Sequence, residues 1–165
     1  MTIVGEPKVD YRVEKQYMGI RTQTPMKGMF TVADHMRKEV SIWFKQKNLN
    51  PAGPPFLRYH VIDMAGQMDI EVGFPIATAV PDDERVKAGV LPAGRYASLI
   101  YTGHGLTGNK ALLGWVKTNG LVLDRWDDEK GDAFRSRCET YLTDPAIEPR
   151  KTKWQIEVAI KLRDQ

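Results

Sequence analysis

The sequence contains a single cysteine, Cys138, so it cannot form an internal disulfide. One thiol cannot build a structural zinc site, and the three histidines, His35, His60 and His104, are not paired at metal-ligand spacing. A chain without disulfides is typical of a reducing compartment. We therefore expect a cytoplasmic protein with no metal and no other cofactor.

Long apolar runs are also lacking, since none approaches the roughly 20 residues that span a membrane. The N-terminus has no charged start followed by an apolar core, so it does not predict a secretion signal. The net charge is only +3 and the basic residues are scattered, which argues against direct binding of nucleic acid. The 165 residues suit one domain or two fused half-domains.

Motifs of the common nucleotide-binding and hydrolase classes are missing as well. The sequence contains no P-loop and no G-x-S-x-G element. The glycines of Gly103-x-Gly105-x-x-Gly108 match a dinucleotide fingerprint by letter, but no parallel βαβ context surrounds them. We interpret Cys138 as a structural residue, because no base lies near it in the sequence.

Two short echoes suggest an internal duplication. The triplet Ile70-Glu71-Val72 recurs as Ile156-Glu157-Val158, and Trp43-Phe44-Lys45 recurs in part as Trp115-Val116-Lys117. The echoes come in the same order, each in an equivalent type of element. We predict a single α+β domain over 1–165, built from two β-α-β-β units at about 8–80 and 86–163. These units form an antiparallel sheet with helices, and a central ligand cleft lies on a pseudo-twofold axis.

Periodicity places the elements within this scheme. Val9, Tyr11 and Val13 alternate with polar residues, which predicts a first strand that resumes through 17–20. Thr31 with Asp34 is typical of a capping box, and the helix that follows ends near Asn48. Further strands are expected at 56–64, 68–78, 86–91, 95–101, 134–142 and 152–162, with a short helix around Trp115 and a charged excursion at 126–132.

The alternation of residues in the last strand makes Glu157 a candidate functional residue. Ile156, Val158 and Ile160 share one face, which should pack on the helices, so Glu157 looks out from the other face beside Ala159. Glutamate is a poor strand former. A solvated strand residue is the alternative, but a carboxylate ringed by aromatic side chains is how a pocket holds a lipophilic cation.

The expected ligand-binding set is Glu157 and Glu71 together with aromatic residues from both units. A desolvated Glu157 can also act as a general acid or base, with the hydroxyl of Tyr141 or Tyr59 beside it. The catalytic set is therefore Glu157 and Tyr141. The aromatic members of the ligand-binding set are Trp43, Phe56, Tyr59, Tyr101, Trp115 and Tyr141, of which the two tryptophans are more often core residues.

Five segments in this order resemble the GyrI-like small-molecule-binding family, which includes effector-binding domains of multidrug-sensing and AraC-type transcription regulators. They cover nearly the whole chain: Gly53-Pro54-Pro55-Phe56-Leu57-Arg58-Tyr59-His60, Asp69-Ile70-Glu71-Val72-Gly73-Phe74-Pro75, Leu91-Pro92-Ala93-Gly94-Arg95-Tyr96-Ala97, Tyr141-Leu142-Thr143-Asp144-Pro145 and Trp154-Gln155-Ile156-Glu157-Val158.

The resemblance implies two β-α-β-β repeats with a ligand cleft where they meet, and a closing-strand glutamate, Glu157 by motif position, that faces lipophilic and often cationic compounds. Ala159-Ile160-Lys161 departs from the proline that members often carry there. Three functions stay open: a module that senses or sequesters lipophilic small molecules, a hydrolase that opens strained cyclopropane rings of genotoxins, and a module that binds a protein partner as gyrase-inhibiting relatives do.

Overall fold

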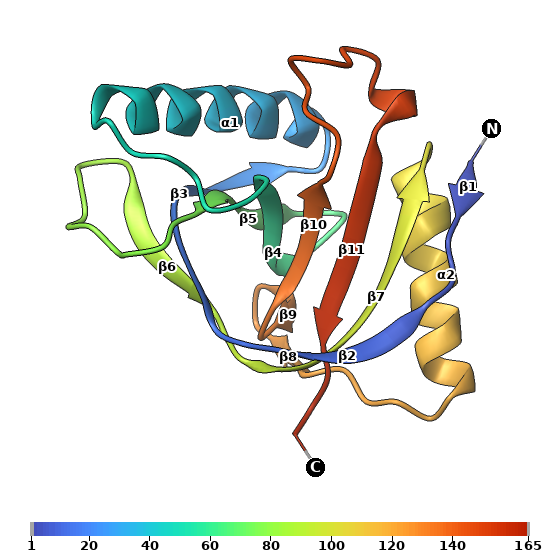
Figure 1. Ribbon diagram of the computed structural model, residues 1–165. Helices are drawn as coiled ribbons and strands as arrows, with labels where there is room; N and C mark the ends of the chain where they lie inside the picture. The colour runs from blue at the N-terminus through green and yellow to red at the C-terminus, as the bar shows by residue number, and fades with distance from the viewer. Residues whose placement is uncertain (1, 165) are drawn as a thin grey trace.

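The computed structural model describes residues 2–164 and contains two helices and eleven strands, all paired antiparallel (Figure 1). The elements in chain order are β1 (Ile3–Val4), β2 (Lys8–Arg12), β3 (Lys15–Pro25), α1 (Met29–Gln46), β4 (Phe56–Ile62), β5 (Gln67–Pro75), β6 (Lys87–Leu91), β7 (Gly94–Thr102), α2 (Gly105–Thr118), β8 (Arg125–Asp128), β9 (Gly131–Phe134), β10 (Arg137–Tyr141), a short 3-10 turn (Lys151–Lys153) and β11 (Gln155–Lys161).

Two β-α-β-β units account for most of this order, as the sequence predicts. The first unit is β3-α1-β4-β5 and the second is β7-α2-β10-β11. They join where β10 pairs with β4, with Glu139 opposite Leu57 and Thr140 opposite Phe56. Glu71 lies on β5 and Glu157 on β11, the closing strands of the two units. The α+β duplication is therefore confirmed, while the exact limits of the repeats stay a prediction.

Both helices cover the same face of the sheet, and each forms a core with its own unit. Val40 and Phe44 of α1 pack with Ile70 of β5. On the second unit, Leu112 and Val116 of α2 pack with β7 and β11 residues including Leu99, Val158 and Ile160. Since alternate strand residues point to opposite faces, Glu157 projects from the face without helices. We call the two sides the helix-covered face and the open face.

The N-terminal strand differs from its prediction. Residues 9–20 do not form one strand of the first unit. β2 pairs with β7 of the second unit, with Val9 opposite Ala97, whereas β3 pairs with β5 of the first unit and with β6, the strand that precedes β7 in the chain. Figure 1 shows the chain crossing between the two halves at this point. The alternation of apolar residues stops at Val13, and the polar residues Glu14, Lys15 and Gln16 follow it where the chain passes from β2 to β3.

Two further expectations are corrected. The capping box is wrong, because α1 begins at Met29 after Gly28 in a left-handed conformation (φ 82°), and Asp34 pairs with Arg37 instead. The charged excursion is an ordered hairpin of β8 and β9, and β9 extends the sheet beside β4. The helix stop is as expected, with Asn48 at a positive φ just beyond α1.

Gly108 allows α2 to lie directly on β7. A Cβ atom at this position would collide with Cδ1 of Tyr101, and one at Gly105 would lie 3.0 Å from the Tyr101 hydroxyl. Gly105 and Gly108, two of the glycines that match a dinucleotide fingerprint, therefore lie in the first turn of α2. We attribute their spacing to close packing of the helix on the Tyr101 ring. Gly114, further along the same helix, has nothing within 4 Å of such a Cβ.

We predict opposite effects of alanine at these two helix positions. Gly108→Ala should lower the free energy of unfolding by about 1–3 kcal/mol through overpacking on Tyr101. Gly114→Ala should raise it by up to about 1 kcal/mol, because alanine is the better helix former. Denaturant titrations of the two variants and the wild type measure this difference. Equal effects at the two positions would contradict the close-packing role.

Candidate functional site

The predicted site residues divide between the two faces of the sheet. Glu157, Glu71 and Phe56 lie on the open face, whereas Tyr59, Tyr101 and Tyr141 lie on the helix-covered face. Strand pairing explains the division: Glu157 stands opposite Thr140, whose side chain points away from that of the next residue, Tyr141. Glu157 and Tyr141 therefore cannot act together on one substrate, contrary to their pairing in the sequence-based expectation.

The two helical tryptophans lie apart from both glutamates of the expected set. Trp43 is packed in the core of the first unit, and its Nε1 donates to Asp83 at 2.8 Å. Trp115 is half-buried against the core of the second unit. Each therefore contributes to the packing of its own helix.

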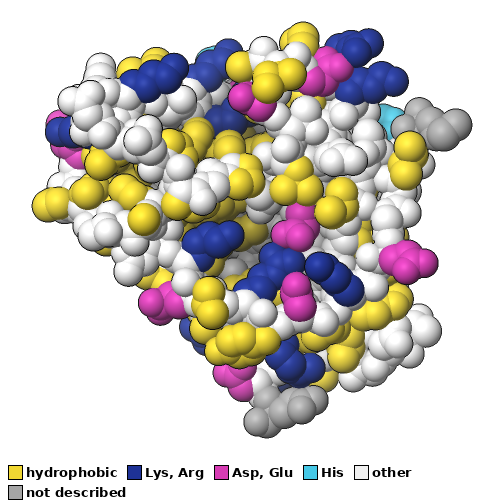
Figure 2. Space-filling view, viewed as in Figure 1, with side chains coloured by type: hydrophobic (Ala, Val, Ile, Leu, Met, Phe, Trp, Pro, Cys, Tyr) yellow, Lys and Arg dark blue, Asp and Glu magenta, His cyan; other side chains and the backbone are white. Residues whose placement is uncertain are grey.

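Glu157 lies in an open-face cleft of about 180 Å³, with Phe56, Tyr96, Ser136 and Cys138 among the lining residues. Arg12 donates to both of its carboxylate oxygens, at 2.9 and 3.2 Å, and to Ser98 at 3.2 Å. The same guanidinium lies 5.5 Å from the centre of the Tyr96 ring. Figure 2 shows basic and acidic side chains gathered beside a hydrophobic hollow. The charge of Glu157 is thus compensated from within the chain.

Glu71 is enclosed by hydrogen bonds on the same face. Tyr17 donates to it at 2.6 Å, Nε2 of His60 lies 2.8 Å away, and Arg58 donates to the Tyr17 hydroxyl at 2.9 Å. Burial works to raise the pKa of Glu71, but the hydrogen bonds from His60 and Tyr17, with the charges of His60 and Arg58, outweigh it and hold that pKa below its ordinary value. This carboxylate is satisfied within the fold.

Glu139 of β10 is a buried carboxylate that the sequence analysis did not select. Tyr59 of the first unit donates to it at 2.6 Å, and Tyr101 of the second unit donates to its other oxygen. Burial and the charge of Glu139 raise the pKa of both tyrosines, so they remain protonated donors. Among residues 2–164, Glu139 has no ion-pair partner. The signal for it in the sequence is the spacing Glu139-x-Tyr141, which puts the two side chains on one face.

A groove of about 800 Å³ opens between α1 and the segment that joins β10 to β11. Its inner wall includes Tyr141 and Trp154, which meet edge to face with their ring centres 5.8 Å apart. Tyr141 follows Glu139 by two positions, so the two side chains project from the same face of β10.

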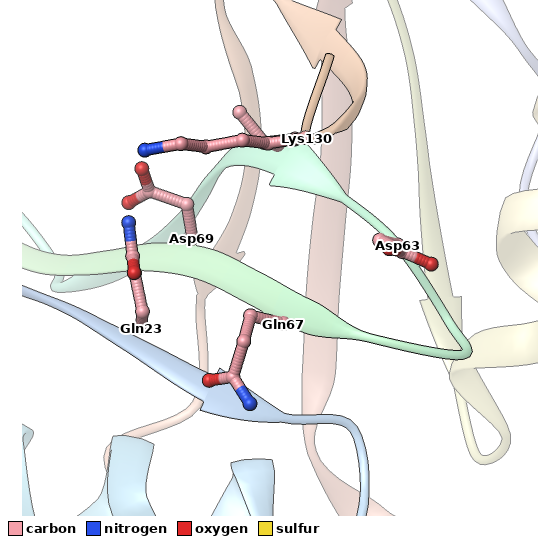
Figure 3. A pocket seen from close by; sticks show the side chains of 6 residues that line it. Gln23, Asp63, Gln67, Asp69 and Lys130 are labelled. Carbon is pink, nitrogen blue, oxygen red and sulfur yellow. The ribbon is translucent and has the colours of Figure 1, made fainter. Parts of the chain in front are cut away.

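A third hollow, of about 300 Å³, lies at the far end of β5 and is polar. Figure 3 shows the polar ends of Gln23, Asp69 and Lys130 close together, whereas Asp63 points away from them. Asp69 is already engaged by Arg21 through two hydrogen bonds of 2.8 Å. This hollow holds no aromatic side chain and offers little to a lipophilic ligand.

Metal and thiol chemistry find little support within the described part of the chain. Residues 2–164 contain no group of three or more His, Cys, Asp or Glu placed to hold a metal ion. Burial raises the pKa of Cys138 to about 12, so the thiolate that acts as a nucleophile is scarce near neutral pH. Neither described helix is long and apolar enough to cross a membrane.

Together, fold and site define a duplicated α+β domain whose two units meet where β10 pairs with β4. A family model described as the GyrI-like small molecule binding domain matches residues 6–163, and the chain belongs to this family. Among curated proteins, no sequence matches it.

Solved structures agree on the fold. The EcmrR C-terminal domain is 17% identical with a TM-score of 0.72, covering 99% of this chain and 100% of that one. A hydrolase from Listeria innocua is 13% identical with a TM-score of 0.63, covering 96% and 92%. SAV2435 bound to tetraphenylphosphonium is 12% identical with a TM-score of 0.62, covering 96% and 94%.

We predict that the Tyr17–Glu71 hydrogen bond stabilises the fold in a pH-dependent way. The pKa of Glu71 is lowered in the folded state, so its contribution is present above the unfolded value of about 4.3 and is lost as the pH falls through the folded value. Tyr17→Phe should cost about 1–3 kcal/mol at pH 7 and less in acid. Denaturant titrations from pH 7 downward, with exposed Tyr11→Phe as the control, measure this. A pH-independent cost would contradict the assignment.

Proposed function

We propose that this domain binds flat, lipophilic small molecules on the helix-covered face, and that it prefers cations to anions because the ligand's charge faces Glu139. The observation that carries the proposal is a buried carboxylate held by two tyrosine hydroxyls and in no ion pair among residues 2–164, although the charge of buried Arg137 acts on it from two positions earlier in β10. The sequence pattern predicts this role for Glu157 instead. Its bidentate ion pair with Arg12 makes Glu157 the weaker partner for an incoming cation.

Electrostatics favours a cation at this position. A carboxylate removed from water loses solvation that hydrogen bonds from neutral donors only partly replace. A ligand that brings a delocalised positive charge supplies the missing compensation, and an aromatic ligand is itself easily desolvated. The rings of Tyr59, Tyr101 and Tyr141 add cation–π contact around the same carboxylate. An anion brought to the same place would meet a like charge.

Two relatives agree with this proposal. SAV2435 has been solved with tetraphenylphosphonium, a lipophilic cation, and EcmrR carries the same fold as its C-terminal domain and is found in a complex with DNA. We extend the same class of ligand to this chain. Its role would then be to sense or sequester such compounds.

Glu139→Gln should weaken binding of tetraphenylphosphonium by on the order of 2–5 kcal/mol, since it removes the charge that faces the cation. That range corresponds to about thirtyfold or more in Kd. Calorimetric titration of wild type and variant measures the change, and a thermal melt of each establishes that the fold is retained. Tetraphenylborate, an anion of the same shape, should bind wild type more weakly than the cation does.

Glu157→Gln is the matched control, since it neutralises a strand glutamate on the opposite face. It should leave the Kd for tetraphenylphosphonium within about twofold, because ligand and charge lie on different sides of the sheet. A loss confined to Glu157→Gln would move the site to the open-face cleft. Equal binding of the phosphonium and the borate would refute the charge preference altogether.

A hydrolase of strained cyclopropane compounds is the second candidate, favoured by the same Tyr–Glu arrangement. In such a reaction water forms a C–O bond to the ring carbon and the ring C–C bond breaks. The electron pair moves to the conjugated carbonyl oxygen, which takes a proton from a tyrosine. Glu139 would accept the proton of the attacking water, and Tyr101 or Tyr59 would donate to the oxygen. A structural relative that carries the name hydrolase agrees with this alternative.

Turnover separates the two functions. A large excess of a cyclopropane-containing alkylator is incubated with the protein and the products are followed by mass. For an enzyme, we expect ring-opened, water-added product beyond one equivalent, lost in Glu139→Gln while binding persists in a direct titration. Product limited to one equivalent, or none, would leave the protein as a binding module.

A further inference from the structure

Arg37 of α1 is a buried cation that lies against the aromatic wall of the groove. Its guanidinium carbon is 5.6 Å from the centre of the Tyr141 ring and 5.6 Å from that of Trp154. Nη1 donates to Asp34 at 2.8 Å, one turn earlier on the same helix. The ring pair is thus already occupied by a positive charge that belongs to the chain.

Asp34 ties this arrangement to the other side of the groove. Its second carboxylate oxygen accepts from Lys151, which belongs to the turn just before Trp154. Hydrogen bonds from Lys151 and Arg37 outweigh the effect of burial and hold the pKa of Asp34 below its ordinary value. The carboxylate of Asp34 therefore stays charged at neutral pH. Because it accepts from Arg37 on α1 and from Lys151 across the groove, it links the two walls of the groove.

The position of Arg37 matches what a bound lipophilic cation requires. Such a ligand needs aromatic faces and a groove open to solvent, and Tyr141, which lines the groove, stands two positions from Glu139 on the same face of β10. The guanidinium covers these rings. An incoming cation meets both an occupied surface and the like charge of Arg37, to which Lys38, Lys45 and Lys151 add at the rim.

We propose that Arg37 is an internal substitute for the ligand, a specificity-determining residue that occupies the cation site on Tyr141 and Trp154 and must leave it before a lipophilic cation binds. This inference rests on the proposed function and adds its regulation. Binding then proceeds from the fraction of molecules in which Arg37 is displaced, and the apparent affinity is reduced by that fraction. Displacement of Arg37 is favourable only for ligands that contact the two rings over a larger area than the guanidinium does.

The test is calorimetric titration of tetraphenylphosphonium into the full chain carrying Arg37→Met. Methionine keeps the unbranched apolar stem but removes the charge and the planar group. We expect the variant to bind about tenfold more tightly, which corresponds to about 1.4 kcal/mol of released competition. Lys38→Met is the matched control, since it removes one positive charge from the exposed rim of the same groove and should change the Kd by less than about threefold.

Other outcomes overturn the proposal in distinguishable ways. Unchanged or weaker binding by Arg37→Met would show that Arg37 does not compete with the ligand. Equal gains in the two variants would reduce its role to general charge repulsion. If tetraphenylborate binds wild type and is lost in Arg37→Met, Arg37 recruits anions. Absence of phosphonium binding by wild type, or indifference to Glu139→Gln, would refute the proposed function itself. Thermal melts of both variants identify any loss of fold.

Discussion

The arrangement of the molecule depends on satisfying one buried carboxylate from both repeats. Glu139 sits on β10, the strand that joins the second unit to the first, and its two oxygens accept hydroxyls from Tyr59 and Tyr101, one from each unit. A buried carboxylate left without donors costs more than a lost hydrogen bond. The two units must therefore keep their relative positions, and α2 must approach closely enough to hold the Tyr101 ring, which Gly108 permits.

The open face and the helix-covered face of this junction differ in how their carboxylates are compensated. On the open face, Glu157 is paired with Arg12 and Glu71 is enclosed by Tyr17 and His60, so the carboxylates there are compensated by the chain itself. On the helix-covered face, Glu139 accepts hydrogen bonds from two tyrosines but forms no ion pair among residues 2–164, and the nearest buried guanidinium on that face of β10, Arg137, lies over the Tyr59 ring. Since a ligand gains most where the protein has left a requirement unmet, the helix-covered face offers a cation the larger gain.

The duplication, the strand order within each unit and the outward direction of Glu157 follow from the sequence, because triplet echoes and alternation are local signals. The partner of Glu157 does not, since Arg12 reaches it only after β2 crosses to the second unit. Glu139 was missed for a related reason. It lies in a short strand with charged and aromatic neighbours, and its donors come from strands whose pairing no local pattern reveals. Gly28, not Thr31, starts α1, since a left-handed glycine can replace a side-chain cap.

The charges met at the rim, at the aromatic wall and at Glu139 differ, and this difference bears on selectivity. The groove rim carries Lys38, Lys45 and Lys151 together with Asp34 and Asp144, Arg37 lies against the aromatic wall, and Glu139 stands two positions from Tyr141 on the same face of β10. A small hydrated cation is repelled at the rim and gains little from the rings. A cation whose charge is spread beneath apolar groups is repelled less by the rim charges and makes a larger contact with the aromatic rings, so it can bind in the same groove. The charged rim therefore selects against small hydrated cations, and the aromatic rings of the same groove select for lipophilic ones.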